Sequence, residues 1–147
     1  MTASDIIGFV PDMVGRAVRY FTERPAVSVE QVYTGTFWED YAGEEAEAVT
    51  DIYFSVQVAN DGAETTIRKA TLRIRNARRE EFDDTKYLDG IPVPHRTAKI
   101  LKFRFGLNGH IGCVTGCRLS LADVGNRTFG CPIRLNPGPA KYEEGYI

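Results

Sequence analysis

Residues 51–75 read DIYFSVQVANDGAETTIRKATLRIR and predict two β-strands joined by a tight turn. From Ile52 to Val58 every second residue is large and apolar, a period of two that is typical of a strand with one buried face. Asn60, Asp61 and Gly62 then supply the residue types that tight turns prefer. The stretch therefore predicts a β-hairpin with one face in the core.

The second strand of this hairpin places Ala70, Leu72 and Ile74 on its inner face. Ile67 has the opposite parity, so we expect the strand to begin after it or to contain a β-bulge. The outer face and the residues after it are rich in cations, namely Arg68, Lys69, Arg73, Arg75, Arg78 and Arg79.

Two interpretations of these cations are open. They are the ordinary solvated side of a sheet, or they bind an acidic partner, for which residues 39–47 of a neighbouring copy are one source. Nucleic acid is not expected, because the net charge is −2 and few aromatic side chains accompany the cations. In the second interpretation Arg73 and Arg75 are partner-binding residues.

The rest of the chain supplies further strands at 27–34, 97–106, 117–123 and 127–135. Residues 36–48 are acidic and predict a solvated loop, and the long charged stretch 76–96 predicts a crossing between two sheets. Asn108-Gly109 is a strong hairpin signal, and Pro132 predicts an edge strand because proline cannot donate to a β-ladder. The tail from residue 136 contains proline and glycine and is expected to leave the sheet.

Six or seven short strands separated by turns predict a β-sandwich. Over residues 27–135 the pattern resembles the immunoglobulin-like or fibronectin-III-like superfold, on strand-and-turn stretches such as FSVQVANDG. The Cys-Trp-Cys core of antibody domains is missing, and the resemblance implies an architecture without an activity. The expected fold is thus mainly β, an immunoglobulin-like antiparallel sandwich of about seven strands with one N-terminal amphipathic helix, divided into an arm (1–25), a sandwich (26–136) and a tail (137–147).

Composition points to an ordinary globular protein. The chain has 147 residues, of which 43% are hydrophobic and 26% charged. A chain of this length and composition can bury a hydrophobic core without disulfides or bound metals. The chain has three cysteines, and an odd count argues against a closed disulfide framework. There is no apolar run of transmembrane length and no secretory signal pattern at residue 1. A cytoplasmic protein, or a virion component assembled in the cytoplasm, is expected.

The side chains best suited to chemistry are His110, Cys113, Cys117 and Cys131. The C-x3-C spacing is within the range of zinc sites, and a cysteine beside a histidine is the pattern of a thiol enzyme. Against both, Cys117 and Cys131 have the inward parity of neighbouring strands, where cysteine packs as a small hydrophobe. We therefore expect buried thiols, with no metal, cofactor or catalytic residue, and keep a metal site, a small-ligand site or a thiol enzyme as the alternative.

The two ends of the chain are the stronger candidates for binding a partner. Residues 11–24 predict an amphipathic helix, whose apolar stripe packs on its own sandwich, in a partner's groove or on a membrane surface. The tail can pair with the sheet edge of another chain. The sequence thus predicts a non-catalytic protein–protein interaction or assembly subunit, with partner-binding residues Met13, Val14, Val18, Phe21, Arg73, Arg75, Tyr142, Tyr146 and Ile147.

Overall fold

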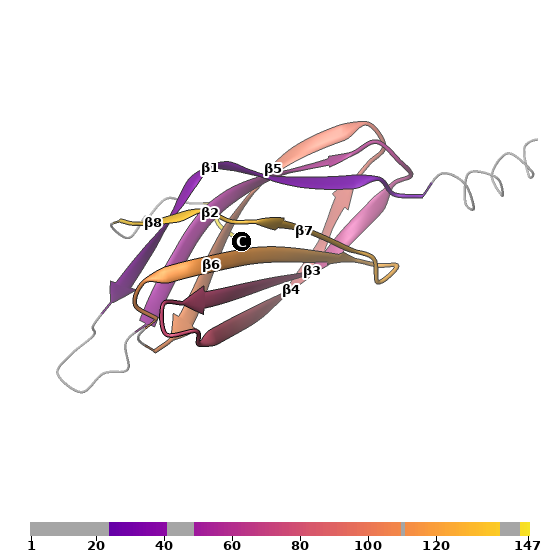
Figure 1. Cartoon of the computed structure of the whole chain (residues 1–147). Coiled ribbons are helices and arrows are strands. Elements are labelled where there is room, and N and C mark those ends of the chain that lie inside the picture. The colour runs from indigo at the N-terminus through magenta and orange to yellow at the C-terminus, as the bar shows by residue number, and fades with distance from the viewer. Residues whose placement is uncertain (1–23, 41–48, 110, 139–144) are drawn as a thin grey trace, which may run out of the picture.

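The computed structural model describes residues 24–40, 49–109, 111–138 and 145–147, which form a sandwich of two β-sheets (Figure 1). Sheet I contains, in spatial order, β5 (Thr97–Asn108), β2 (Val49–Asn60), β1 (Val27–Asp40) and β8 (Leu135–Pro137). Sheet II contains, in spatial order, β4 (Glu81–Val93), β3 (Thr65–Asn76), β6 (Val114–Asp123) and β7 (Thr128–Pro132). Neighbours are antiparallel except β1 and β8. The mainly β, two-sheet architecture is confirmed, with eight strands among the described residues.

The core lies between the sheets and is formed by the faces that the alternation predicts. Three phenylalanines form its centre: the ring of Phe54 on β2 stacks 5.7 Å from Phe103 and 5.9 Å from Phe105, both on β5. Sheet II contributes branched aliphatic side chains that are fully buried. The predicted inward residues Ile52, Val56, Val58, Ala70, Leu72, Ile74, Leu101, Leu119 and Leu121 all belong to this core.

Three buried polar side chains close strand ends: Asn60 ends β2, Asn76 ends β3 and Asp123 ends β6. The Asn60 amide donates to the carbonyl oxygens of Ala63 and Val93, at 2.8 and 2.9 Å. Its oxygen accepts the N–H groups of Ala26 and Gly62, at 3.1 and 2.9 Å. Because each polar atom of Asn60 has partners, its burial carries no desolvation penalty from an unmade bond.

The predicted hairpin of residues 51–75 is wrong, although both of its strands form. β2 pairs with β1 and β5 in sheet I, whereas β3 pairs with β4 and β6 in sheet II. The turn packs against the start of β1, where Asp61 donates its N–H to Ala26 and Ala63 donates its N–H to Arg24, both at 3.1 Å. The turn residues reverse the chain as expected, but the chain then passes to the other sheet. The bulge expected at Ile67 is present between Ile67 and Lys69.

Residues 76–96 are not a crossing between sheets. Most of them form β4, which pairs with β3 from Thr65↔Val93 to Arg75↔Glu81. β4 is the edge of sheet II, so its side chains are only partly covered and polar residues are tolerated along its length. The crossing between the sheets follows this strand, at residues 94–96.

The start of the predicted acidic loop is also part of a strand, because β1 continues to Asp40. A bulge between Val32 and Thr36 interrupts its pairing with β2, after which pairing resumes. Gly35 lies in this bulge, where a Cβ atom would be 2.6 Å from the Tyr53 carbonyl oxygen. Glycine is needed because the two backbones approach too closely for a side chain. Residues 41–48 lie outside the described residues.

Two further expectations differ from the structure. Asn108-Gly109 does not close a hairpin, because β5 and the following β6 belong to different sheets. The tail does not simply leave the sheet, because β8 pairs with β1 from Gly35↔Leu135 to Phe37↔Pro137. The edge position expected from Pro132 is confirmed, since β7 is an edge strand of sheet II.

The predicted helix at 11–24 lies outside the described residues except for Arg24. The described residues contain strands and turns and no helix. Within them, nothing has the length and apolar character of a membrane-crossing helix.

Candidate protein-interaction site

Arginine side chains gather on the outer face of sheet II. We call this surface the arginine face and define it by Arg73 and Arg75 of β3 and Arg118 of β6. Strand alternation places all three on one side, because their neighbours Leu72, Ile74, Cys117 and Leu119 have the inward parity. The register fixes their positions: Arg73 lies opposite Arg118 on one side and Asp83 of β4 on the other.

Arg75 is paired. Its guanidinium donates to the Glu81 carboxylate of β4 at 2.6 Å, and both side chains are exposed. The hydrogen bond and charge of Arg75 lower the pKa of Glu81 below its ordinary value. The charge of Arg75 is thus balanced by a carboxylate of the same chain.

Arg73 and Arg118 differ from Arg75 in this respect. Neither side chain makes a hydrogen bond or ion pair with another residue in the part of the chain that the structure describes. Like charges directly opposite each other on neighbouring strands are unfavourable. Asp83 lies on the other side of Arg73, so the local excess of positive charge is centred on Arg118, on a protein whose net charge is −2.

The Arg118 side chain lies over Gly130 of the edge strand β7. A Cβ atom at Gly130 would be 3.4 Å from a terminal guanidinium nitrogen of Arg118 and 2.8 Å from the Leu119 carbonyl oxygen. Glycine at this position lets the arginine lie flat against the strand. A surface hollow of about 850 Å³ lies beside the two arginines, lined among others by Asp83, Thr115, Gly116 and Pro132.

Two adjacent guanidinium groups suit a carboxylate-bearing surface. Arginine binds carboxylates through two parallel N–H donors, and these charge-assisted bonds are stronger than neutral ones. The arrangement can bind and orient an acidic partner.

Tyr146 and Ile147 are brought together with β5 of their own chain. Ile147 donates its N–H to the Lys102 carbonyl oxygen at 2.7 Å, and the N–H of Arg104 donates to the Ile147 carbonyl oxygen at 3.2 Å. The sequence predicted pairing of this tail with the sheet edge of another chain, whereas the structure shows it on the β5 edge of its own chain. Tyr53 has an outward parity and is nevertheless only 2% exposed, with the Tyr146 ring packed against it.

Two of the three cysteines, Cys117 and Cys131, hold thiols that burial keeps protonated. Burial raises the pKa of the Cys117 thiol to about 12, with Cys131 adding a smaller effect. Burial also raises the pKa of Cys131. Thiols that keep their protons are poor metal ligands and poor nucleophiles. Cys113 is exposed, and His110 lies outside the described residues.

No three His, Cys, Asp or Glu side chains among the described residues are grouped so that they could hold a metal ion.

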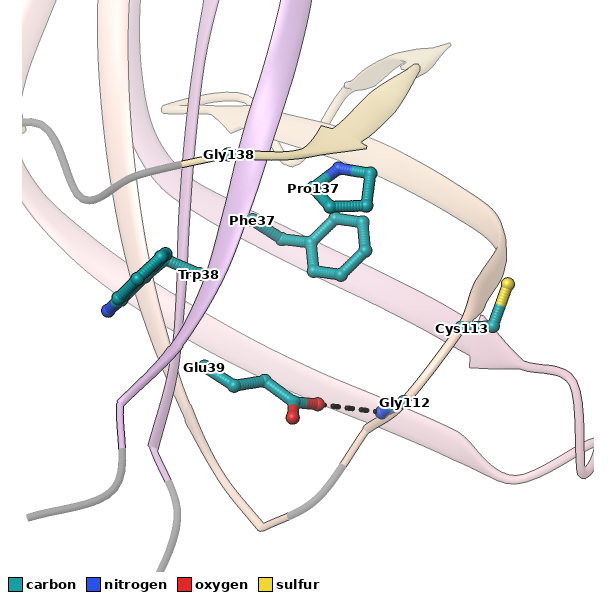
Figure 2. A pocket seen from close by; sticks show the side chains of 7 residues that line it. All are labelled: Phe37, Trp38, Glu39, Gly112, Cys113, Pro137 and Gly138. Carbon is teal, nitrogen blue, oxygen red and sulfur yellow. Dashed lines mark hydrogen bonds between the residues drawn. The ribbon is translucent and has the colours of Figure 1, made fainter.

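A second hollow, of about 700 Å³, lies where β1 and β8 meet the segment before β6 (Figure 2). Phe37 and Pro137 lie against each other on one side, and Trp38 points away from them. The Glu39 carboxylate accepts the N–H of Gly112 at 2.9 Å across its floor. Its lining is largely apolar, and Cys113 is at its rim.

The other predicted partner-binding residues, Met13, Val14, Val18, Phe21 and Tyr142, lie outside the described residues. Sequence reasoning missed Arg118. Its signal was present, because it alternates with Cys117 and Leu119 in the same way that Arg73 alternates with Leu72 and Ile74. What the sequence lacked was the pairing of β3 with β6, which brings the two arginines together.

Comparisons with known proteins show no family. No protein-family model and no curated protein matches the chain. Among solved structures, a structural-genomics target named SoR45 has a TM-score of 0.43 at 12% identity, covering 86% of this chain and 96% of that one. The putative ApaA protein from Bordetella pertussis has a TM-score of 0.41 at 11% identity, covering 76% and 90%. Sporulation control protein Spo0M from Bacillus subtilis has a TM-score of 0.39 at 15% identity, covering 78% and 51%.

Proposed function

We propose that this protein is a non-catalytic subunit of a protein–protein assembly, in which the arginine face of one copy binds acidic side chains of another. The observation that carries the proposal is the juxtaposition of Arg73 and Arg118, whose side chains make no hydrogen bond or ion pair with the described part of the chain. A neighbouring carboxylate would remove their mutual repulsion and gain charge-assisted hydrogen bonds.

The chain itself supplies a suitable anion source. Glu44, Glu45 and Glu47 fall within four residues of sequence, and the protein has 20 acidic against 18 basic side chains. Complementary charges on two copies would set the orientation of the contact and speed their association. In this proposal the sandwich is an immunoglobulin-like rigid scaffold, the terminal arms contact neighbours, and assembly takes place in the cytoplasm, as for a cellular complex or a virion.

The test is charge reversal followed by mixing. One full-length variant carries Arg73→Glu and Arg118→Glu, and the other carries Glu44→Lys, Glu45→Lys and Glu47→Lys. Each variant alone places like charges on both surfaces and is expected to be monomeric by light scattering. Their mixture restores one attractive pair and is expected to associate.

Arg134→Gln is the matched control, because Arg134 is exposed and its side chain makes no hydrogen bond or ion pair with a described residue. This variant should assemble like the wild type. Wild-type assembly by either charge-reversed variant alone, or no association on mixing, would contradict the proposal.

A further inference from the structure

The open edge of β5 carries a docking site that is already occupied by the last residues of the sequence. The two hydrogen bonds of Ile147 go to Lys102 and Arg104, one on each side of Phe103. This is the bonding pattern of two parallel strands, with Ile147 aligned with Phe103. The tail thus adds a short strand to sheet I, as in peptide recognition by β-augmentation.

Side-chain contacts make the site selective for an aliphatic residue at the position of Ile147. Parallel alignment turns this side chain to the same face as Phe103, and Ile147 packs half-buried against the core. Lys86 of β4 closes the site from the other sheet. Its Nζ lies 3.3 Å from the Ile147 carbonyl oxygen and 5.3 Å from the centre of the Phe105 ring.

An aromatic residue is favoured one position earlier. The Tyr146 ring meets the Tyr53 ring edge to face, with centroids 5.4 Å apart. Lys102 Nζ lies 5.8 Å from the centre of the Tyr146 ring. Arg104 lies 5.7 Å from the centre of the Tyr53 ring, so each tyrosine has a cation beside it. Aromatic pairs and cation–π contacts both stabilise this arrangement.

The tail reaches this site from the opposite edge of the same sheet. β8 and Ile147 flank β1, β2 and β5, so four strand spacings, about 19 Å, separate them. The chain from Gly138 to Gly145 can span about 24 Å at most, since each residue contributes about 3.4 Å. A connection with so little slack is the situation that favours exchange of a terminal segment between copies.

We propose that the β5 edge also receives Tyr146 and Ile147 of a second copy, so that neighbouring subunits exchange their C-terminal segments. The exchanged tail makes the same contacts as the tail of the chain itself, which is why exchange costs little. Once copies are held together, the high local concentration of tails favours occupation in trans. This inference rests on the proposed function only in that self-association brings the copies together.

The test is a disulfide formed between two different copies. Because Ile147 aligns with Phe103, Tyr146 aligns with Lys102, and the spacing of adjacent strands, about 4.8 Å, lies within the range of Cα separations that a disulfide spans. Two full-length proteins are made in a Cys113→Ser background, one with Lys102→Cys and the other with Tyr146→Cys. They are mixed, oxidised and separated on a non-reducing gel.

We expect a covalent heterodimer in the mixture that is lost when Ile147→Asp is added to the Tyr146→Cys chain. A third protein with both cysteines in one chain is the control that the bond can form. Cross-linking within this control chain, with no heterodimer in the mixture, would overturn the inference. A heterodimer that still forms when both chains also carry Arg73→Gln and Arg118→Gln would support tail exchange and contradict assembly through the arginine face. The experiment therefore distinguishes failure of one proposal from failure of the other.

Discussion

Arg73 on β3 lies directly opposite Arg118 on β6, and neither side chain makes an ion pair with a described residue, whereas Arg75 two positions along β3 is bonded to Glu81. The same strand face therefore holds a paired and an unpaired arginine. A solvated sheet face does not require like charges at directly opposed positions. The contrast directs the functional interpretation to Arg73 and Arg118 more than to Arg75.

Removing one of the opposed arginines should stabilise the isolated subunit. Arg118→Gln is expected to raise the free energy of unfolding by about 0.2–1 kcal/mol at low salt, because it relieves a like-charge cross-strand pair. Urea denaturation at a protein concentration low enough to keep the chain monomeric measures this change. Arg75→Gln is the comparison, since it removes a paired arginine from the same face and should leave stability unchanged or slightly lower. Equal effects of the two substitutions would argue against repulsion.

Loss of the Asn60 amide should weaken the whole sandwich. Asn60→Ala leaves four backbone groups without their buried partner and is expected to cost about 1–3 kcal/mol in the free energy of unfolding. Asn108→Ala, at the exposed end of β5, is the control and should change stability by less than about 0.5 kcal/mol. Thermal or urea unfolding gives both values, and a neutral Asn60→Ala would mean that the side chain is not closing these strands.

A methyl group at Gly35 should not be tolerated. The added Cβ would lie 2.6 Å from the Tyr53 carbonyl oxygen and 2.8 Å from side-chain atoms of Leu135 and Phe54. Gly35→Ala is therefore expected to cost about 1–3 kcal/mol, the usual effect of overpacking. Gly106→Ala, where the nearest atom is 3.6 Å away, should be close to neutral in the same unfolding assay. Similar stability of the two variants would contradict the bulge geometry of β1.

The thiols should differ in reactivity. In the native protein a thiol reagent is expected to modify exposed Cys113 rapidly and Cys117 and Cys131 only after unfolding. The Cys117 pKa is raised to about 12 from an ordinary value near 9, so the unfolded chain loses this proton at lower pH than the folded chain. The stabilisation from the protonated buried thiol is present below pH 9 and is lost as pH rises toward 12. Cys117→Ala should reduce this alkaline loss of stability, and rapid native labelling of Cys117 would show that it is accessible.

The sequence predicted the faces of the strands better than their partners. Alternation from Ile52 to Val58 and from Ala70 to Ile74 correctly identified what is buried, because side-chain period depends only on the strand itself. Turn residues at 60–62 correctly marked a reversal, but a reversal does not specify which sheet the next strand joins. The charged strand β4 was missed because an edge strand with partly covered faces has weak alternation.

For the candidate site too, the sequence predicted which face of a strand each residue lies on but not which strands are neighbours. Arg73 was placed outward by its own strand, whereas its proximity to Arg118 depends on the pairing of β3 with β6, about 45 residues apart in sequence. The tail was predicted to pair with the sheet edge of another chain, and the structure places its last residues on β5 of the same chain. Its docking on β5 depends on Lys86, Tyr53 and Lys102, which come from three strands and share no local pattern.

The central claim is assembly through the arginine face, and the most direct test is the solution mass of the full-length chain. Light scattering with size-exclusion chromatography, at about 50 mM and about 500 mM salt, compares the wild type with Arg73→Gln/Arg118→Gln and with Arg134→Gln. We predict a discrete oligomer at low salt for the wild type and Arg134→Gln that dissociates at high salt, and a monomer mass for the double variant at both salt concentrations. A wild-type chain that is monomeric at low salt, or an oligomer that neither salt nor the double substitution changes, would contradict the account.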